Sequence, residues 1–285
     1  MLESRFFPDR GSDEKTWSYL EVGLVRGASQ LVECRSATPL RIINPKMHAP
    51  SCHVLVTNYG GGMVEGDCVY LKVVCQDGAS LHVGSVGNLQ VYGNGVKGCS
   101  HNLEGFVGNR ALCVIHADPV VLHSGSIFRQ KQVWNVRPGG SLLIAEWVVA
   151  GRLEIGERFD FVKYVSDVTV LIDDRPLIVD RFEFQPQLFD YHDPAFFGGL
   201  ACLLNIYFVG SEWIALENLL SEAIDHRQKV DSETLAAICE TRDHDGCILR
   251  ALSPNRRSLD WVTDTIYEFL SQEKYLGFNP LERKY

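Results

Sequence analysis

Apolar and polar residues alternate along most of the chain with the period of a β-strand. Leu20, Val22 and Leu24 alternate with Glu21, Gly23 and Val25, a pattern that is typical of a strand with one buried face. Similar runs, bounded by turn-forming residues, lie at 31–34, 39–43, 52–57, 68–75, 120–136, 145–152, 168–172, 177–180 and 200–209. Residues 173–176 are a hairpin-turn signal between two of these runs. The pattern predicts a mainly β protein.

A short motif recurs at 77–83, 108–114 and 138–144. Each copy has a tight turn, a small residue and an apolar strand, and its leucines, Leu81, Leu112 and Leu142, are 31 and 30 residues apart. Residues 27–31 resemble a looser, earlier copy. Such a period indicates stacked units, as in a solenoid or β-helix. Because β-rich proteins repeat glycine turns in any case, a chance repeat stays open as the alternative.

The last third of the chain adds helical patterns. Apolar residues recur with helical spacing over 211–224, where Ser211 is a candidate N-cap, and over 255–271, which follows Ser253 and Pro254 as candidate N-cap and first helical residue. Residues 234–240 and 247–252 flank a hairpin. We expect a polar arm over 1–18 and a single domain over 19–285. Its fold should be a β-helix-like stack of strands in two-layer sheets, with both helices packed on it.

One glycine-rich turn stands out between two strand patterns. Gly60, Gly61, Gly62 and Gly66 fall within seven positions, and Asp67 follows at the exit. The turn ends in an acid where a P-loop needs Gly-Lys-Ser/Thr, and it leads into a strand where a dinucleotide fingerprint opens a helix, so both phosphate sites are excluded. Two interpretations remain: a turn that only joins strands, and a site that favours a cation.

Charge and cysteine usage narrow the class of protein. The net charge is -9, which argues against nucleic acid as a partner. No apolar run reaches the roughly 18 residues of a membrane span, and the N-terminus has no signal-peptide pattern. The nine cysteines form no Cys-x-x-Cys pair. We therefore expect a cytoplasmic protein with reduced thiols, without membrane or nucleic-acid partners.

A carboxylate at the end of a very apolar strand is the first candidate for chemistry. Glu146 lies in the run 145–152, and a buried carboxylate needs a partner. Arg152 or a metal ion could be that partner.

Two loops place potential ligands close together. Asp190, His192 and Asp193 fall within four positions, and residues 243–245 form a similar Asp-His-Asp run. Both are also ordinary turn sequences. Because no catalytic triad or convincing acid pair can be named, an enzyme has the least support.

Together these residues resemble the urease accessory protein UreD family, also called UreH in some bacteria. The shared motifs, in chain order, are Pro39-Leu40, residues 60–67, Asp118 to Leu122, Phe128-Arg129-Gln130, Ser141-Leu142-Leu143 with Glu146, Gly151-Arg152, Gly156-Glu157-Arg158-Phe159, and residues 245–252. Gln90 stands where family members often have lysine, whereas Tyr92 is kept. The match covers most of residues 20–275.

The resemblance implies a fold and a task. The family is similar to a β-helix-like stack with two added helices, and it is not known as an enzyme by itself. It implies a scaffold that joins a UreF-type helical protein and a UreG-type GTPase, which binds the GTP, and that docks on the urease apoprotein. It also implies that no cofactor is tightly bound and that nickel is in transit through an internal polar path. Mapped onto this sequence, the path candidates are Asp67, Glu146 and Arg152, with Asp180 weaker.

The main alternative is a stand-alone β protein that binds a metal or a small molecule through Asp190, His192 and Asp193.

Overall fold

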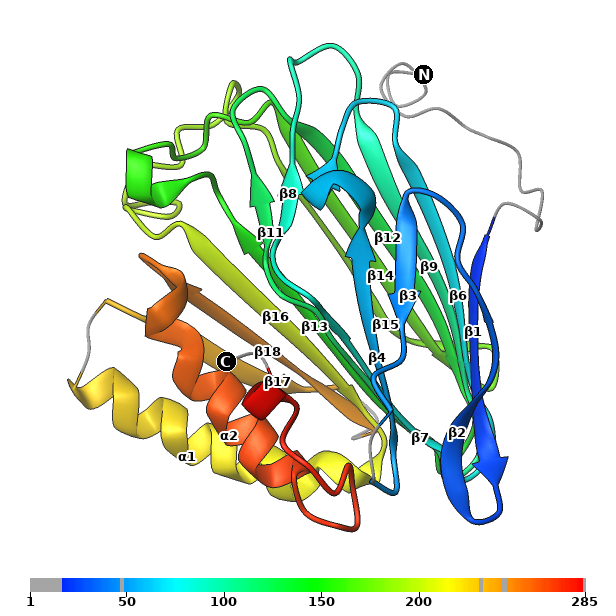
Figure 1. Ribbon diagram of the computed structural model, residues 1–285. Coiled ribbons are helices and arrows are strands. Elements are labelled where there is room, and N and C mark those ends of the chain that lie inside the picture. Colours follow the sequence, from blue (N-terminus) through cyan, green and yellow to red (C-terminus); the bar gives the residue numbers. More distant parts are fainter. Residues whose placement is uncertain (1–16, 47–48, 231–232, 242–244, 284–285) are drawn as a thin grey trace.

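The computed structural model describes residues 17–46, 49–230, 233–241 and 245–283. Most of the predicted arm over 1–18, and Asp243 and His244 of the second Asp-His-Asp loop, lie outside the described residues. Two β-sheets face each other, and two helices cover the outer face of the second sheet (Figure 1). The predicted β-helix-like fold with two helices is confirmed.

The first sheet has seven strands in the order β15-β14-β12-β9-β6-β1-β2. Its central strands run parallel, and β2 and β15 pair antiparallel at the two edges. The strands span β1 Ser18–Val25, β2 Ala28–Arg35, β6 Cys68–Cys75, β9 Cys99–Val107, β12 Ile127–Val136, β14 Lys163–Ile172 and β15 Arg175–Phe184.

The second sheet has eleven strands, with the main order β17-β18-β16-β13-β10-β7-β4-β3 and a branch of β5, β8 and β11 beside β13. β4, β7, β10 and β13 run parallel, whereas β3, β16, β18 and β17 pair antiparallel. The strands span β3 Leu40–Ile43, β4 Cys52–Asn58, β5 Gly62–Met63, β7 Ser80–Ser85, β8 Leu89–Val91, β10 Leu112–His116, β11 Val120–Leu122, β13 Ser141–Val149, β16 Cys202–Val209, β17 Leu235–Glu240 and β18 Gly246–Ser253.

The recurring motif marks successive coils of the stack. In each coil a strand of the first sheet turns directly into a strand of the second: β6 into β7, β9 into β10 and β12 into β13. The turns also stack, since the Gly78 N–H donates to the Asn109 carbonyl at 2.9 Å and the Arg110 N–H donates to the Gly139 carbonyl at 3.0 Å. The repeat is therefore structural and not a chance resemblance.

Two details of the predicted repeat are wrong. Cys113, not Leu112, is the register partner of Leu81 and Leu142, so Leu112 points to the opposite face of the sheet. Residues 27–31 are no coil copy either. A tight turn sends β2 back beside β1 in the first sheet, and β4 takes the place next to β7.

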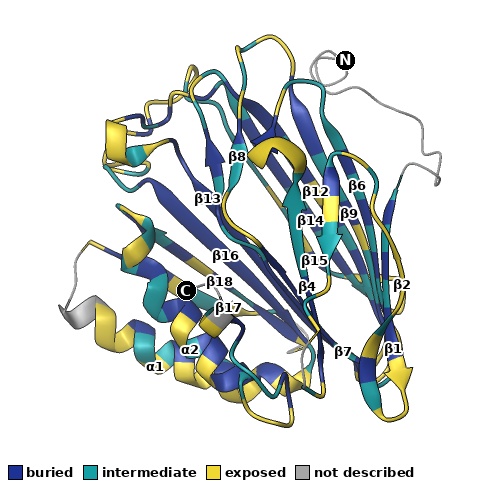
Figure 2. Cartoon of the chain, in the orientation of Figure 1, coloured by how far each residue is buried: buried dark blue, intermediate teal, exposed yellow. Residues whose placement is uncertain are grey.

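The chain builds two apolar layers. One fills the space between the sheets and includes Leu20, Leu81 and Leu142. The other lies between the second sheet and the helices α1 (Ile214–Val230) and α2 (Asp260–Leu270), where Val262 and Ile266 have no exposed surface. Figure 2 shows both helices buried on the sheet side and exposed on the other.

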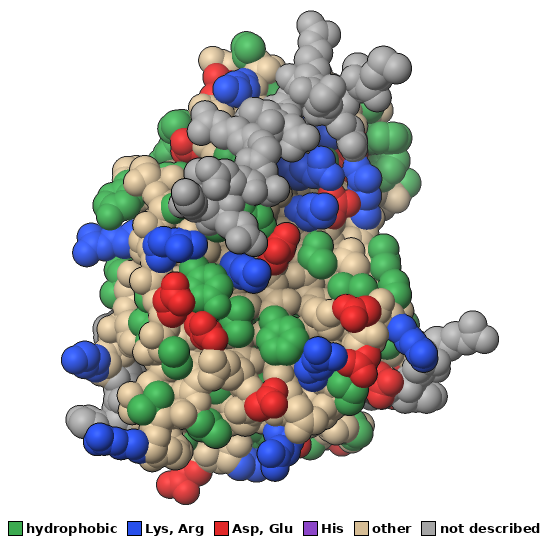
Figure 3. Space-filling view, turned by 90° about the vertical axis from the view of Figure 1, so that its right-hand side faces the viewer, with side chains coloured by type: hydrophobic (Ala, Val, Ile, Leu, Met, Phe, Trp, Pro, Cys, Tyr) green, Lys and Arg blue, Asp and Glu red, His purple; other side chains and the backbone are tan. Residues whose placement is uncertain are grey.

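The outer face of the first sheet is left to solvent. Arg129 and Arg181 both pair with Asp167, at 2.9 and 3.2 Å. On the side of the molecule that faces right in Figure 1, basic and acidic side chains are interspersed (Figure 3). The helices therefore cover only one face of the two-sheet body.

The helices are where predicted, but their starts differ. A 3-10 turn at Ser211–Trp213 precedes α1, with Gly210 at the N-cap position, so Ser211 does not cap it. A second 3-10 turn, Arg256–Leu259, precedes α2, and its cap is Asn255, whose Oδ1 accepts from the Ser258 N–H at 3.2 Å. Ser253 is the last residue of β18. Within the described part of the chain, no helix is long and apolar enough to cross a membrane.

Candidate functional site

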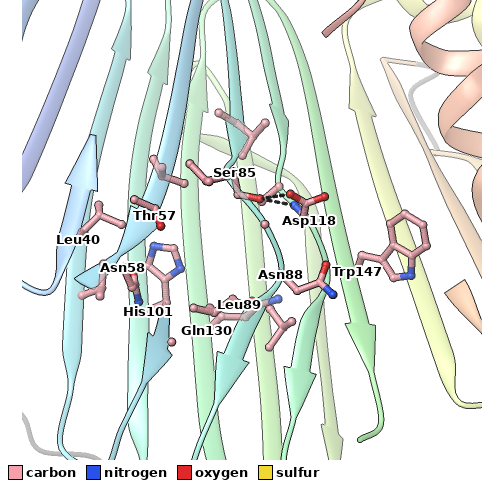
Figure 4. Close-up of a pocket in the computed structure, with 18 of the residues that line it drawn as sticks. Leu40, Thr57, Asn58, Ser85, Asn88, Leu89, His101, Asp118, Gln130 and Trp147 are labelled. Atoms are coloured by element: carbon pink, nitrogen blue, oxygen red, sulfur yellow. Dashed lines mark hydrogen bonds between the residues drawn. The ribbon is translucent and has the colours of Figure 1, made fainter. Parts of the chain in front are cut away.

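A cavity of about 320 Å³ lies where the second sheet is interrupted. β4, β7 and β10 end there, and short linkers lead on to the branch strands β5, β8 and β11. Residues of all three linkers line the cavity, among them Gly61, Asn88 and Asp118, and His101 and Gln130 line it from the first sheet (Figure 4). The interruption thus opens the space between the sheets toward the surface.

The glycine-rich turn forms part of the cavity wall. Gly61 and Gly62 line it, and Gly60, Gly61 and Gly66 have φ of 81°, 78° and 82°, which favour glycine. A Cβ on Gly62 would lie 2.4 Å from the Gln90 carbonyl oxygen. Gly60, Gly61 and Gly66 therefore serve the backbone geometry of the turn, and Gly62 serves close approach at the cavity wall.

Asp67 stabilises the turn that precedes it. Its Oδ2 accepts a hydrogen bond from the Val64 N–H at 2.9 Å, and its own N–H donates to the Val64 carbonyl at 3.0 Å. Asp67 is not among the residues that line the cavity. The geometry accounts for Asp67 as a turn residue, and its part in a cation path stays a prediction.

Glu146 lies inside the protein, between the two sheets. It alternates along β13 with residues that face the helices and shares its inward face with Ile144 and Val148. Its carboxylate accepts from Gln132 Nε2 and from Ser166 Oγ, both at 2.8 Å and both from the first sheet. Burial raises the pKa of Glu146 to about 7, although these hydrogen bonds favour the ionised form.

Arg152, one of the two partners that the sequence suggested for Glu146, pairs with Glu157 instead. Its Nε and Nη2 donate to Glu157 Oε2 at 2.9 and 2.6 Å. Glu157 Oε1 in turn accepts from the Ser124 N–H at 2.7 Å. The chain turns sharply after β13 at Gly151, with φ of 137°, so Arg152 leaves the interior and lines a surface groove.

Glu146 belongs to a set of inward-facing polar side chains, here called the interior polar row. It comprises His101, Gln130, Gln132, Glu146, Ser166, Asp180, Asn205, Tyr207 and Arg250. His101, Gln130 and Ser166 are register neighbours across the first sheet, and Glu146, Asn205 and Arg250 are register neighbours across the second. The row therefore crosses an otherwise apolar interior.

Two members of the row have buried polar atoms with unmet hydrogen-bonding capacity. Among the described residues, neither side-chain amide atom of Asn205 has a partner, nor has His101 Nε2. Asn205 has no exposed surface. Burial also lowers the pKa of His101 to about 4, so its ring is neutral at physiological pH. Buried polar atoms of this kind are expected to hold water or a passing ligand.

The far end of the row is closed by an ion pair. Asp180 Oδ2 accepts from Tyr207 Oη at 2.8 Å and from Arg250 Nη2 at 2.6 Å. Arg250 also lines an apolar cleft of about 400 Å³ between the free edges of the two sheets, together with Phe182 and Leu252. The structure thus brings Glu146 and Asp180 into one row, with the cavity at one end and this cleft at the other.

The loop that carries Asp190, His192 and Asp193 uses its carboxylates locally. Asp190 Oδ1 accepts from the His192 N–H at 3.0 Å, and Asp193 Oδ1 accepts from the Ala195 N–H at 2.8 Å. In the part of the chain that the structure describes, no three His, Cys, Asp or Glu side chains are gathered to hold a metal ion. These contacts account for both aspartates as turn residues.

Sequence reasoning missed most of the polar row. The signal for Gln130 and Gln132 was present, because they alternate in one strand with the apolar Phe128 and Trp134 and so share their inward face. The signal for Asn205 was weaker, since it interrupts an apolar run only once. Nothing in the sequence indicated that these strands face Glu146.

The row offers oxygen and imidazole donors that are spread along a line. Nickel(II) accepts such ligands. The fold and site define a class: a two-sheet, solenoid-like β scaffold with a helical layer and a buried polar row between two surface openings.

Comparison with known proteins gives this class a name. The model of the family described as "UreD urease accessory protein" matches residues 18–284, and the chain belongs to this family. It is 29% identical to the urease accessory protein UreD of Cytophaga hutchinsonii over 280 residues, 94% of this chain and 98% of that protein. It is 33% identical to urease accessory protein D of Oryza sativa subsp. indica over 56% of this chain and to that of Arabidopsis thaliana over 55%, and these matches span about half of each plant protein.

Proposed function

We propose that this protein is a non-catalytic scaffold in urease maturation that passes nickel along the interior polar row. The single observation that carries the proposal is the row itself, which has Glu146 at the cavity and the Asp180–Arg250 pair at the cleft. Polar side chains buried in an apolar interior cost free energy, roughly 1–3 kcal/mol each when unpaired. A function that requires them accounts for that cost.

The proposed partners follow from the family. The chain would bind a UreF-type protein, recruit through it a UreG-type GTPase that supplies the GTP site, and dock on the urease apoprotein. Exposed apolar side chains near the openings, such as Tyr59 at the cavity end and Phe196 near the cleft, support protein contacts there. The proposed location is the cytoplasm, which the nine free cysteines support.

The conduit is tested by removing the charge of Glu146 while keeping its shape. Glu146→Gln should lower the nickel content of co-expressed urease at least threefold, measured by metal analysis of purified urease. Glu104→Gln is the matched control, because Glu104 is an exposed carboxylate on β9. Normal nickel loading with Glu146→Gln would contradict the conduit.

Complex assembly is measured separately. A pull-down with a UreF-type partner should be equal for the wild type, Glu146→Gln and Glu104→Gln. If the wild type forms no complex at micromolar protein, the scaffold role fails whatever the nickel result.

A second candidate is a stand-alone binding protein, which the mainly apolar walls of the cavity favour. Calorimetric titration of the chain alone with nickel or zinc separates the two. Tight one-site binding without any partner would favour the stand-alone role, since a conduit must release its cargo.

A further inference from the structure

Three buried histidines lie on the outer face of the second sheet, next to α2. His53 on β4 and His82 on β7 are register partners, and His116 is the last residue of the neighbouring strand β10. Leu81 and Val83 flank His82 and face the core between the sheets, so His82 faces the helices. The three histidines are only 2–5% exposed, which sets them apart from ordinary surface imidazoles.

The rings of His53 and His82 are in direct contact. Their Nδ1 atoms lie 3.1 Å apart, and the rings stack with centroids 4.8 Å apart. His82 Nε2 lies 2.9 Å from Tyr267 Oη of α2, and the Phe278 ring packs edge-on against His53 with centroids 5.3 Å apart. The histidine pair therefore joins the sheet to α2 and to the segment that follows α2.

The short contact between the two Nδ1 atoms limits how many protons the pair can hold. An imidazole nitrogen either donates or accepts, so one Nδ1 carries a hydrogen and the other does not. If both rings were cationic, two N–H groups and two positive charges would face each other. One cationic ring could still donate to the other, but its charge would be buried, which costs free energy. The contact therefore favours two neutral rings.

Titratable groups also face the pair from α2 and from β10. Burial raises the pKa of Tyr267 well above its usual value, so its Oη stays protonated beside His82. The His116 ring lies edge-on to the Tyr267 ring, with centroids 5.0 Å apart. The negative charge of Asp118, in the linker after β10, raises the pKa of Tyr267 further. Asp118 therefore favours a positive charge in this group, whereas burial and the contact between the two rings oppose it.

We propose that His53 and His82, together with Tyr267, form an acid-sensitive latch that holds α2 on the second sheet. At neutral pH both rings are neutral and the contacts with Tyr267 and Phe278 are kept. When α2 moves away, the rings reach water and titrate with the usual histidine pKa of about 6.5. The open form then takes up protons that the closed form holds less well, so the closed fraction falls as pH drops below about 6.5.

The latch is connected to the cavity through the strands that carry it. The three histidines come from β4, β7 and β10, which are the same strands that end at the cavity. Movement of α2 would therefore remove packing from the strands that lead to the cavity walls. The latch does not depend on what the cavity binds or passes on, so it stands or falls apart from the proposed function.

The experiment is hydrogen–deuterium exchange of the full chain at pH 7.5 and 5.5, with labelling times scaled to the intrinsic exchange rate. The measured quantity is the pH ratio of α2, which is its opening equilibrium at pH 5.5 divided by that at pH 7.5. We expect a pH ratio of at least three for α2, and a smaller one for β12, a central strand of the first sheet. One histidine that is neutral when closed and titrates normally when open would give a ratio of about ten.

A double variant with His53→Asn and His82→Gln separates titration from packing. Both substitutions keep a polar amide at the contact and remove the titrating ring. The double variant should lose most of the pH ratio of α2, whatever its stability at pH 7.5. A merely structural role would change exchange at both pH values and leave their ratio as it is. His226→Asn is the matched control, because His226 is an exposed histidine on α1, and it should keep the wild-type ratio.

Three outcomes would overturn the latch: equal pH ratios for α2 and β12 in the wild type, a double variant that keeps the wild-type ratio, and a His226→Asn variant that loses it. If the double variant fails to fold, His53→Asn alone decides. It removes the ring that faces His82 and should at least halve the pH ratio of α2, so an unchanged ratio would also refute the latch.

Discussion

At the scale of single residues, the same side-chain type serves different purposes according to its surroundings. Asp67 and Glu146 are both acids near strand ends in the sequence. Asp67 holds a backbone N–H in a partly exposed turn, whereas Glu146 is buried among neutral donors. Only the second arrangement needs a reason beyond local structure, because a carboxylate is costly to bury.

The turn role of Asp67 can be separated from a charge role. Asp67→Ala removes the acceptor for the Val64 N–H and should lower the free energy of unfolding by about 1 kcal/mol, measured by urea denaturation. Asp67→Asn keeps an acceptor oxygen and should change it little. Both variants should assemble with a UreF-type partner, and Asn should load urease with nickel normally. Nickel loading as poor in Asn as in Ala would show that the charge of Asp67 matters.

The titration of Glu146 should appear in the pH dependence of stability. Its pKa rises from 4.5 to about 7 on burial, so between these values the folded protein holds a proton that the unfolded chain has released. The free energy of unfolding therefore falls as pH rises through this range. The Glu146→Gln variant should not show this fall, because glutamine does not titrate. We expect the difference in unfolding free energy, variant minus wild type, to grow by about 1–3 kcal/mol between pH 5 and 7.5. A difference independent of pH, as expected for Glu104→Gln, would contradict this assignment.

At the scale of elements, the positions of the strands could be predicted from local sequence patterns, but the register in which they pair could not. The period of two predicted β1 and β6, and a continuous apolar run predicted β16, because the burial of each strand follows from its own sequence. The register of β10 was missed because two positions, Leu112 and Cys113, are both apolar and both buried, on opposite faces of the sheet. An alignment of the repeats on their leucines is therefore shifted by one residue from the register in which the strands pair.

The residues that cap the helix starts were also not predicted correctly, and the observed caps can be tested by mutation. Asn255, not Ser253, accepts from an N–H of the turn before α2, and Gly210, not Ser211, is at the N-cap position of the turn before α1. Asn255→Ala should lower the free energy of unfolding by about 0.5–2 kcal/mol, and Asn255→Asp should largely restore it. Ser211→Ala is the matched control and should change it by less than about 0.5 kcal/mol. Equal losses at the two positions in thermal or urea unfolding would refute the assignment of the caps.

At the scale of the whole molecule, the site is a product of how the sheets face each other. The contacts of Glu146 with Gln132 and Ser166 join strands of opposite sheets, and the cavity exists because three strands of one sheet break at the same level. Alternation predicts which residues point inward, but not which inward residues meet. The prediction of a polar interior came from the family resemblance. The structure adds Asn205, Tyr207 and Arg250 to that interior, whereas Arg152 pairs with Glu157 at a surface groove.

A substitution at Asn205 tests whether the interior polar row is a path for nickel or only a defect in core packing. With no exposed surface and no partner for its amide among the described residues, it weakens the fold by burying unpaired polar atoms. Asn205→Leu keeps the branched shape and the number of side-chain heavy atoms, and it should raise the free energy of unfolding by about 1–3 kcal/mol, measured by urea denaturation. If the interior polar row carries nickel, the same variant should also lower the nickel content of urease at least threefold, because an apolar side chain then stands between Glu146 and Arg250. A variant that is more stable and still loads urease fully would show that this stretch of the row is only a flaw in packing, and nickel would need another route.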